Sequence, residues 1–408
     1  MTSGRYLIWG GTTVVVLALA VVALTVFVDP YRTFGTPTLR GWTELKPRIY
    51  QQAGLAKTYQ LDRVAPRTVL LGNSRVEIGF DPASALWPTN AQPVFNAAEA
   101  GKDLFTALIM LQEAIAVGHL KTAVLGVDFQ DFLQRSYNGN SGLRPSGPDE
   151  LRLLVDRSGR PNHARFLQVW RDWVTSTLTI DAVTDSLETL LDQSSYASTT
   201  MTPSGFNPLH EYRLYAARDG YYALFAHSAN MYAEQYSRYA LPNFSDPSTI
   251  ANARYLREIL DLANTHRIRL ILFTPPYHAK YLEMLHRMGF WGSFRAWQRT
   301  LAHLVDDARH RGANVTLFDC SAYNSFTTEA VPPAGDEGAT MKWYWEPGHY
   351  KSALGDELLR LFFDGSGPGY RLTVDDVDSI LAQTEDQRAE YIGRNSAAAI
   401  LRNSQKSR

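Results

Sequence analysis

The longest apolar run in the chain lies near its N-terminus. Leu7 to Val28 forms 22 consecutive uncharged positions, and as a helix it would be about 33 Å long, enough to cross a bilayer. Arg5 precedes the run and Asp29 follows it, so the positive-inside rule predicts that the N-terminus is cytoplasmic and the remainder extracytoplasmic. A cleaved signal peptide is the alternative, but signal cores are shorter, at about 7–15 residues. We therefore predict that residues 1–29 form a cytoplasmic stub and an uncleaved single-pass anchor in the inner (cytoplasmic) membrane.

Beyond the anchor, short apolar runs alternate with segments of helical periodicity. The pattern predicts strands at 67–71, 94–95, 122–129, 269–274 and 314–318, and helices at 104–117, 254–266, 291–312 and 351–363. Strands that alternate with helices are typical of parallel βαβ units. The predicted fold class is therefore α/β, with a doubly wound, mostly parallel sheet in a three-layer arrangement.

The same pattern divides the chain into four parts. We expect the anchor, a juxtamembrane connector at 30–64, an α/β domain at 65–365 and a tail at 366–408 that holds a short helix and a frayed end. A mostly helical insertion at about 133–253 interrupts the α/β domain, with a helical pair at 162–193 and then a tyrosine-dense stretch. An insertion at the carboxyl end of a parallel strand lies over the crevice where α/β sheets bind ligands. The tyrosines are equally compatible with a packing layer and with a binding surface.

Composition narrows the functional classes. The 40 Lys and Arg residues balance 41 Asp and Glu residues for a formal net charge of -1, which gives no support to nucleic-acid binding. The single cysteine, Cys320, excludes an intramolecular disulfide and a cysteine-based zinc site. The histidines show no metal-ligand spacing and no phosphate-binding loop motif is present, so we predict no metal and no cofactor, and a cytosolic nucleotide-binding role is disfavoured.

Three short segments carry candidate chemistry. Gly72-Asn73-Ser74-Arg75 directly follows the first predicted strand, which places the Ser74 hydroxyl at the crevice of the sheet. Glu346 lies three residues before His349, across a Pro-Gly turn, so its carboxylate can hold the imidazole as the base of a hydrolytic triad. The loop from Asn96 to Gly101 is rich in small residues, and its backbone N–H groups could donate to an oxyanion.

The order of these segments resembles the SGNH (GDSL-like) hydrolase superfamily. Gly72-Asn73-Ser74 matches the nucleophile block with Asn in place of Asp, Gly101 matches the second block, and Glu346-x-x-His349 matches the last block with Glu in place of Asp. Asp128 occupies the place of the asparagine that donates to the oxyanion in that family, and an ionised carboxylate there would repel the developing charge. Asp128 could instead pair with Arg75 or stay protonated, or the third oxyanion donor could come from elsewhere.

One further segment follows the strand at 269–274. Tyr277 and His278 would lie at the carboxyl edge of the sheet, where they could contact substrate, but we favour a proline-stiffened loop with a surface histidine.

The resemblance is nearest to a membrane-anchored branch, which includes the D-alanine transfer protein of teichoic acid synthesis and the alginate O-acetylation proteins. It implies an extracytoplasmic acyltransferase or esterase that acts on O-acyl groups of a cell-envelope or secreted polysaccharide, beside a multi-pass membrane O-acyltransferase. Ser74, His349 and Glu346 would form the triad. The alternative is a catalytically weak or inactive accessory protein that binds a glycan or a membrane acyltransferase partner.

Overall fold

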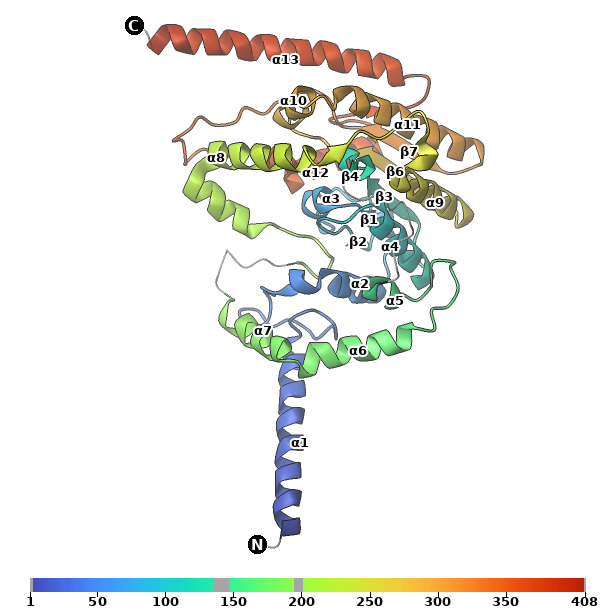
Figure 1. The fold of residues 1–408 in the computed structure, drawn as a ribbon, viewed down its shortest axis with the longest axis vertical. Helices are drawn as coiled ribbons and strands as arrows, with labels where there is room; N and C mark the ends of the chain where they lie inside the picture. The colour runs from blue at the N-terminus through green and yellow to red at the C-terminus, as the bar shows by residue number, and fades with distance from the viewer. Residues whose placement is uncertain (1–2, 136–146, 194–200, 407–408) are drawn as a thin grey trace.

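A mostly parallel six-stranded sheet forms the centre of the protein (Figure 1). The computed structural model describes residues 3–135, 147–193 and 201–406. The strands lie in the order β10-β7-β6-β3-β1-β2, with bounds β1 Thr68–Leu71, β2 Val94–Asn96, β3 Thr122–Gly126, β6 Arg269–Thr274, β7 Val315–Asp319 and β10 Tyr370–Arg371. Only β10 runs antiparallel, against β7. The predicted α/β class with a mostly parallel sheet is confirmed. Strand β2 is added on one side of β1, and β3 and the later strands are added on the other side.

Helices cover both faces of this sheet because its central strands β1, β3 and β6 are apolar on both sides. Val69 and Leu71 of β1 belong to one buried cluster and Leu70 to the other, as the two-residue period of a strand requires. The first cluster includes α2 Ala53–Val64, α4 Leu104–Val117, α9 Ala251–Thr265, α10 Ala279–Arg287 and α11 Trp291–His310. The second includes α3 Ser74–Gly79 and α12 Ser352–Asp364.

The N-terminal helix α1, Ser3–Val28, projects away from the rest of the protein (Figure 1). Within the described residues, Gly4–Val28 is the one helix that is long and apolar enough to cross a membrane. The expected connector at 30–64 is only partly a connector. Its second half forms α2, whose residues are largely buried; among them, Lys57 pairs with Glu77 at 3.1 Å inside the protein.

The insertion between β3 and α9 contains helices α5 Pro148–Leu151, α6 Arg165–Leu178, α7 Ile180–Leu191 and α8 His210–Tyr236. The predicted helical pair at 162–193 corresponds to α6 and α7, whereas the tyrosine-dense stretch is one long helix that kinks at Gly220 (φ 72°). Two short strands, β4 Gln134–Arg135 and β5 Tyr239–Ala240, pair antiparallel at the ends of the insertion. Residues 136–146 and 194–200, which the predicted insertion includes, lie outside the described residues.

The C-terminal tail is more structured than expected. Its first residues form β10, which extends the sheet, and the predicted short helix is the 30-residue helix α13, Val377–Lys406. Arg388 of α13 donates to Glu283 at 2.8 and 3.0 Å, and Glu385 pairs with Arg295 at 2.9 Å. Val377, Ile380 and Leu381 at the start of α13 are buried in the first hydrophobic cluster. The ion pairs add polar contacts further along this mainly polar helix.

Candidate active site

The candidate nucleophile lies on the sharp turn that follows β1. Gly72 has a φ of 141°, and a Cβ there would lie 2.7 Å from Val76 Cγ2 and 3.1 Å from the Gly126 carbonyl oxygen, so the turn requires glycine. Asn73 then caps α3, because its Oδ1 accepts a hydrogen bond from the Arg75 backbone N–H at 3.1 Å. Ser74 is the first residue of α3 and is half-buried.

The candidate base and its orienting carboxylate lie on a small hairpin formed by β8 Tyr344–Glu346 and β9 His349–Tyr350. Ser74 Oγ lies 2.7 Å from His349 Nε2, and His349 Nδ1 is hydrogen-bonded to Glu346 Oε1. A carboxylate accepts at Nδ1, so the proton belongs on Nδ1 and the lone pair of Nε2 faces the serine hydroxyl. The structure thus brings Ser74 into contact with His349, which lies 275 positions later in the sequence, and with Glu346 behind it.

Glu346 is fully buried, and three donors surround it. Besides the imidazole, the Gly348 backbone N–H donates to Oε2 at 3.1 Å and the Tyr232 hydroxyl donates to Oε1 at 3.0 Å. Burial alone would raise the pKa of Glu346, but the charge and hydrogen bond of His349 bring it below its ordinary value. Burial, and then the neighbouring Glu346 charge, raise the pKa of Tyr232. Glu346 is therefore held as a carboxylate and Tyr232 as a neutral donor.

A second buried network lies directly beneath the serine. Arg75 forms an ion pair with Asp128, whose Oδ2 also accepts from Asn73 Nδ2 at 3.0 Å. Asp128 Oδ1 accepts from the Tyr277 hydroxyl at 2.8 Å and from the Gln130 backbone N–H at 3.0 Å. The expected pairing of Asp128 with Arg75 is therefore present.

Arg75 also ties the two halves of the site together. Its Nε donates to the Gly348 carbonyl oxygen at 2.9 Å. Arg75 therefore contacts the residue before His349, just as Ser74 contacts His349 itself. Burial opposes the charge of Arg75, but Asp128 and the surrounding tyrosines raise its pKa well above the ordinary value. A permanent cation thus fixes the hairpin that carries the histidine against the helix that carries the serine.

The residues expected to contact substrate beside the triad are instead buried. Asn73, Arg75, Asp128 and Tyr277 are at most 9% exposed, and they use their polar atoms on one another or on the backbone. The expectation of a surface His278 is wrong: it caps α10, accepts from the Lys280 backbone N–H at 3.1 Å and donates to the Glu329 carbonyl oxygen at 2.8 Å. Burial lowers the pKa of His278 to about 4. These side chains support the site from below.

The small-residue loop lies against the nucleophile turn, because the Glu99 backbone N–H donates to the Gly72 carbonyl oxygen at 3.2 Å. Two other N–H groups of the loop, those of Ala97 and Ala98, donate to Leu70 and Asn96. Gly101 is exposed and has a φ of 73°. The earlier positions of this loop are thus engaged in holding its shape, and Gly101 stays the candidate donor from this loop.

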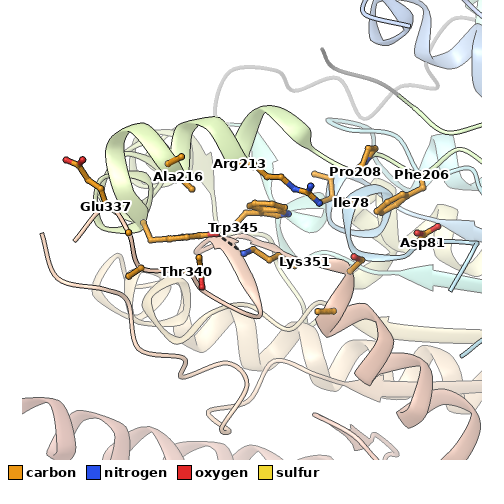
Figure 2. A pocket seen from close by; sticks show the side chains of 16 residues that line it. Ile78, Asp81, Phe206, Pro208, Arg213, Ala216, Glu337, Thr340, Trp345 and Lys351 are labelled. Carbon is orange, nitrogen blue, oxygen red and sulfur yellow. Dashed lines mark hydrogen bonds between the residues drawn. The ribbon is translucent and has the colours of Figure 1, made fainter. Parts of the chain in front are cut away.

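A cavity of about 690 Å³ opens beside the triad. Ile78, which lies one turn along α3 from Ser74, lines it, as does Trp345, which precedes Glu346 (Figure 2). Arg213 and Lys351 add positive charge, and the Lys351 amino group lies 4.4 Å from the centre of the Trp345 ring. Burial lowers the pKa of Lys351 to about 8. Asp81 and Glu337 line the same cavity, so its lining carries charges of both signs beside the aromatic side chain of Trp345. The triad residues themselves are not among the residues that line it.

Sequence reasoning missed Tyr232, which helix α8 of the insertion brings to Glu346. Tyr281 of α10 lies next to Tyr232 and accepts a hydrogen bond from Arg75 at 3.3 Å. The ring of Tyr281 stacks on that of Tyr277, with 4.7 Å between the ring centres. Tyr232 is one of several tyrosines in its segment, and no local signal distinguishes it. The structure shows how closely Tyr232 approaches the hairpin, because a Cβ on Gly348 would lie 2.4 Å from the Tyr232 hydroxyl.

Within the described part of the chain, no group of three or more His, Cys, Asp and Glu side chains is arranged to hold a metal ion. Comparison with models of known protein families finds no match. A search among curated proteins also finds no match.

Proposed function

We propose that the protein is a serine-dependent acyl-transfer enzyme, an O-acyltransferase or esterase. The observation that carries this proposal is the continuous hydrogen-bonded chain from Ser74 through His349 to Glu346. A serine at the crevice of a parallel sheet, a base within 2.7 Å and a buried carboxylate behind the base form the arrangement that activates a hydroxyl nucleophile.

In the proposed reaction, Ser74 Oγ attacks the carbonyl carbon of an ester while His349 Nε2 takes the hydroxyl proton. The tetrahedral intermediate collapses to an acyl-serine, and His349 returns the proton to the leaving alcohol. A second alcohol, or water, then gives up its proton to His349 and attacks the acyl-serine, which releases Ser74 with its proton restored. Glu346 keeps the imidazole in the required tautomer and stabilises its protonated form.

The oxyanion needs donors, and we assign this role to the backbone N–H groups of Ser74 and Gly101. The first N–H groups of a helix have no partner within the helix, and Ser74 is the first residue of α3. The carboxylate of Asp128 does not count against this assignment, because Arg75 neutralises it and three further donors surround it.

The cavity beside the triad is the proposed site for the part of the substrate that carries the acyl group. The lining offers the edge of Trp345 as apolar surface and both acidic and basic side chains, Asp81 and Glu337 with Arg213 and Lys351, as hydrogen-bond partners for the hydroxyl groups of a sugar. The strand order supports our proposal of a flavodoxin-like, doubly wound sheet, in which β1 and β3 would form the switch point. This order agrees with the resemblance to SGNH hydrolases, from which we take a cell-envelope or secreted polysaccharide as the substrate.

We further propose that α1 anchors the protein as a single-pass helix in the inner membrane, with the sheet domain extracytoplasmic. Helix α1 is long and apolar enough to span a bilayer. A multi-pass membrane O-acyltransferase as partner and acyl donor is part of the same proposal and rests on the family resemblance.

The test is hydrolysis of p-nitrophenyl acetate by the full-length protein in detergent. We expect Ser74→Ala to lower turnover by about 10³-fold or more, because a triad acts as a unit, while Ser379→Ala, on the exposed side of α13, leaves it unchanged. A serine-directed fluorophosphonate should label the wild type and Ser379→Ala but not Ser74→Ala. Labelling that persists in Ser74→Ala would refute the assignment, and a wild type that neither turns over ester nor reacts would favour the accessory glycan-binding role.

A further inference from the structure

Helices α6 and α7 turn their polar side chains into the protein and their apolar side chains outward, whereas surface helices of soluble proteins do the reverse. Their apolar side chains are exposed to the surroundings, with Phe166 at 84%, Ile180 at 81% and Leu191 at 85% exposed, and Trp170 and Trp173 more than half exposed. Phe166, Trp170 and Trp173 are spaced by four and three residues, so they lie on one face of α6. Large contiguous apolar surfaces of this kind mark an interaction site.

The polar faces of the same two helices are turned into the protein, where their buried carboxylates are hydrogen-bonded. Asp172 accepts from Arg152 at 2.8 and 3.0 Å and from the Tyr59 hydroxyl at 2.9 Å. Asp185 of α7 accepts from the Tyr31 hydroxyl, and Ser186 is also buried. Rotating either helix to bury its apolar face would break these bonds and leave buried charges unpaired. The outward direction of the apolar face is therefore built into the fold.

The position of the two helices indicates what covers them. They lie crosswise at the end of α1 that enters the protein (Figure 1). The Thr25 hydroxyl of α1 donates to the Thr177 carbonyl oxygen at 3.3 Å, and the rings of Phe34 and Trp173 meet at 6.0 Å. From Leu7 to Thr25 the helix rises 18 residues, about 27 Å, which is close to the roughly 30 Å thickness of a bilayer core.

We propose that the apolar face of α6 and α7, defined by Phe166, Trp170, Trp173, Ile180 and Leu191, lies in the membrane interface and packs against lipid. Membrane anchoring by α1, which this inference takes from the proposed function, places the outer boundary of the bilayer at the level of these helices. Tryptophan is favoured at such a boundary, and amphipathic helices lie there with the apolar side down. The exposed Arg171 can reach the lipid headgroups with its long side chain.

This arrangement has a consequence for the candidate active site. A protein held only by one helix and a flexible connector would sample many orientations above the membrane. Three helices that contact the membrane together fix both the distance and the tilt of the sheet domain, so that the crevice with Ser74 is presented at one height.

The proposal is tested by site-directed spin labelling of the full-length protein in lipid nanodiscs. Single cysteines are placed at Phe166, Ile180 and Leu191, with Val15→Cys in α1 as the lipid reference and Arg360→Cys in α12 as the aqueous reference. The native Cys320 is buried, so unmodified protein gives the labelling background. We expect the three labels, like that at position 15, to be more accessible to oxygen than to a water-soluble nickel complex, and the label at position 360 to show the reverse.

The references separate the two layers of the inference. If position 15 reports lipid while positions 166, 180 and 191 report water, the lipid face is refuted and the anchor stands. If those three positions become shielded only in native membranes, the occupant is a protein and the proposal of lipid contact is also refuted. If position 15 reports water, the anchoring on which the inference rests has failed.

Discussion

Asp128 shows how a single residue can look unfavourable in the sequence and be required in the structure. A carboxylate at this place would repel an oxyanion if it were free, but Arg75 is 4% exposed and depends on Asp128 as its counter-ion. Because Arg75 also holds Gly348, the charge of Asp128 acts on the site through the position of the hairpin. Asp128 is therefore a positioning residue.

We expect Asp128→Asn to destabilise the protein by about 3–5 kcal/mol, because it leaves a buried guanidinium without its counter-ion. The measurement is denaturant unfolding of the full chain in detergent. Asp219→Asn is the control, since Asp219 forms an exposed pair with Arg218 and its loss should change stability by less than about 0.5 kcal/mol. Equal stability of Asp128→Asn and wild type would show that the pair contributes little.

His278 makes a prediction about pH. Its pKa is lowered to about 4 in the folded protein because burial disfavours the imidazolium, while the unfolded chain titrates near 6.5. Between these values the unfolded state binds more protons, so the contribution of His278 is present above pH 6.5 and is lost as the pH falls toward 4, by up to about 3 kcal/mol.

The measurement compares the acid dependence of thermal unfolding in the wild type and in His278→Asn. Asparagine can reproduce the cap on the Lys280 N–H but cannot be protonated in this range. We expect the wild type to lose more stability than the variant between pH 6.5 and 4. Parallel curves for the two proteins would contradict the neutral, buried state of His278.

At the scale of elements, the contact between α3 and α12 sets the position of the nucleophile. Helix α12 passes so close that a Cβ on Gly355 would lie 1.7 Å from the Gly79 carbonyl oxygen, and a Cβ on Gly79 would lie 2.1 Å from the Tyr350 ring. Tyr350 follows His349, so this one crossing aligns the serine helix with the histidine hairpin.

Gly355→Ala is accordingly expected to lower stability by about 1–3 kcal/mol, as overpacking does, and to lower ester turnover by separating Ser74 from His349. Gly292→Ala is the matched helical control, because nothing lies within 4 Å of its Cβ position; it should leave stability unchanged or raise it by up to about 1 kcal/mol. Thermal unfolding and p-nitrophenyl acetate turnover measure both effects. A Gly355→Ala protein with unaltered stability would refute the close packing.

The elements also show what a single sequence can predict. Helix α4 and strand β6 match their predicted bounds. The apolar positions of α4 follow the helical period, and β6 is a short, unbroken apolar run between polar residues. Helix α2 is not among the predicted elements, although Leu55, Tyr59 and Leu61 are buried on it, because the helix also buries polar residues that interrupt the apolar pattern. One of these is Lys57, which pairs with Glu77. Hydropathy cannot reveal a buried ion pair, since both partners read as surface residues.

Some residues of the candidate site could likewise be predicted from the sequence, and others could not. Ser74, Glu346 and His349 could be identified because each lies in a short motif at a strand end or turn. Tyr232 comes from a distant helix and reaches Glu346 only through the tertiary fold. The burial of Tyr277 and His278 also depends on contacts with remote segments, such as Asp128 and Glu329.

At the scale of the whole molecule, the anchor and the candidate active site lie at opposite sides of the α6–α7 layer (Figure 1). Apart from the charge at the N-terminus, Arg5 is the basic group before the apolar run, and Asp29 is the first charged residue after it. Moving Arg5 across the bilayer would cost several kcal/mol, which favours a cytoplasmic N-terminus. In this proposed orientation the sheet domain would face the side where cell-envelope polysaccharides are found.

The prediction for this topology uses the single, buried native cysteine as a silent background. In intact spheroplasts, a membrane-impermeant maleimide should label Arg360→Cys at once, because this position is exposed on α12 beyond the membrane. Gly4→Cys, at the start of α1, should be labelled only after the membrane is permeabilised. The reverse pattern would place Ser74 in the cytoplasm, where the triad could still hydrolyse a soluble ester but could not meet an extracytoplasmic polymer, so orientation separates the proposed chemistry from the proposed substrate.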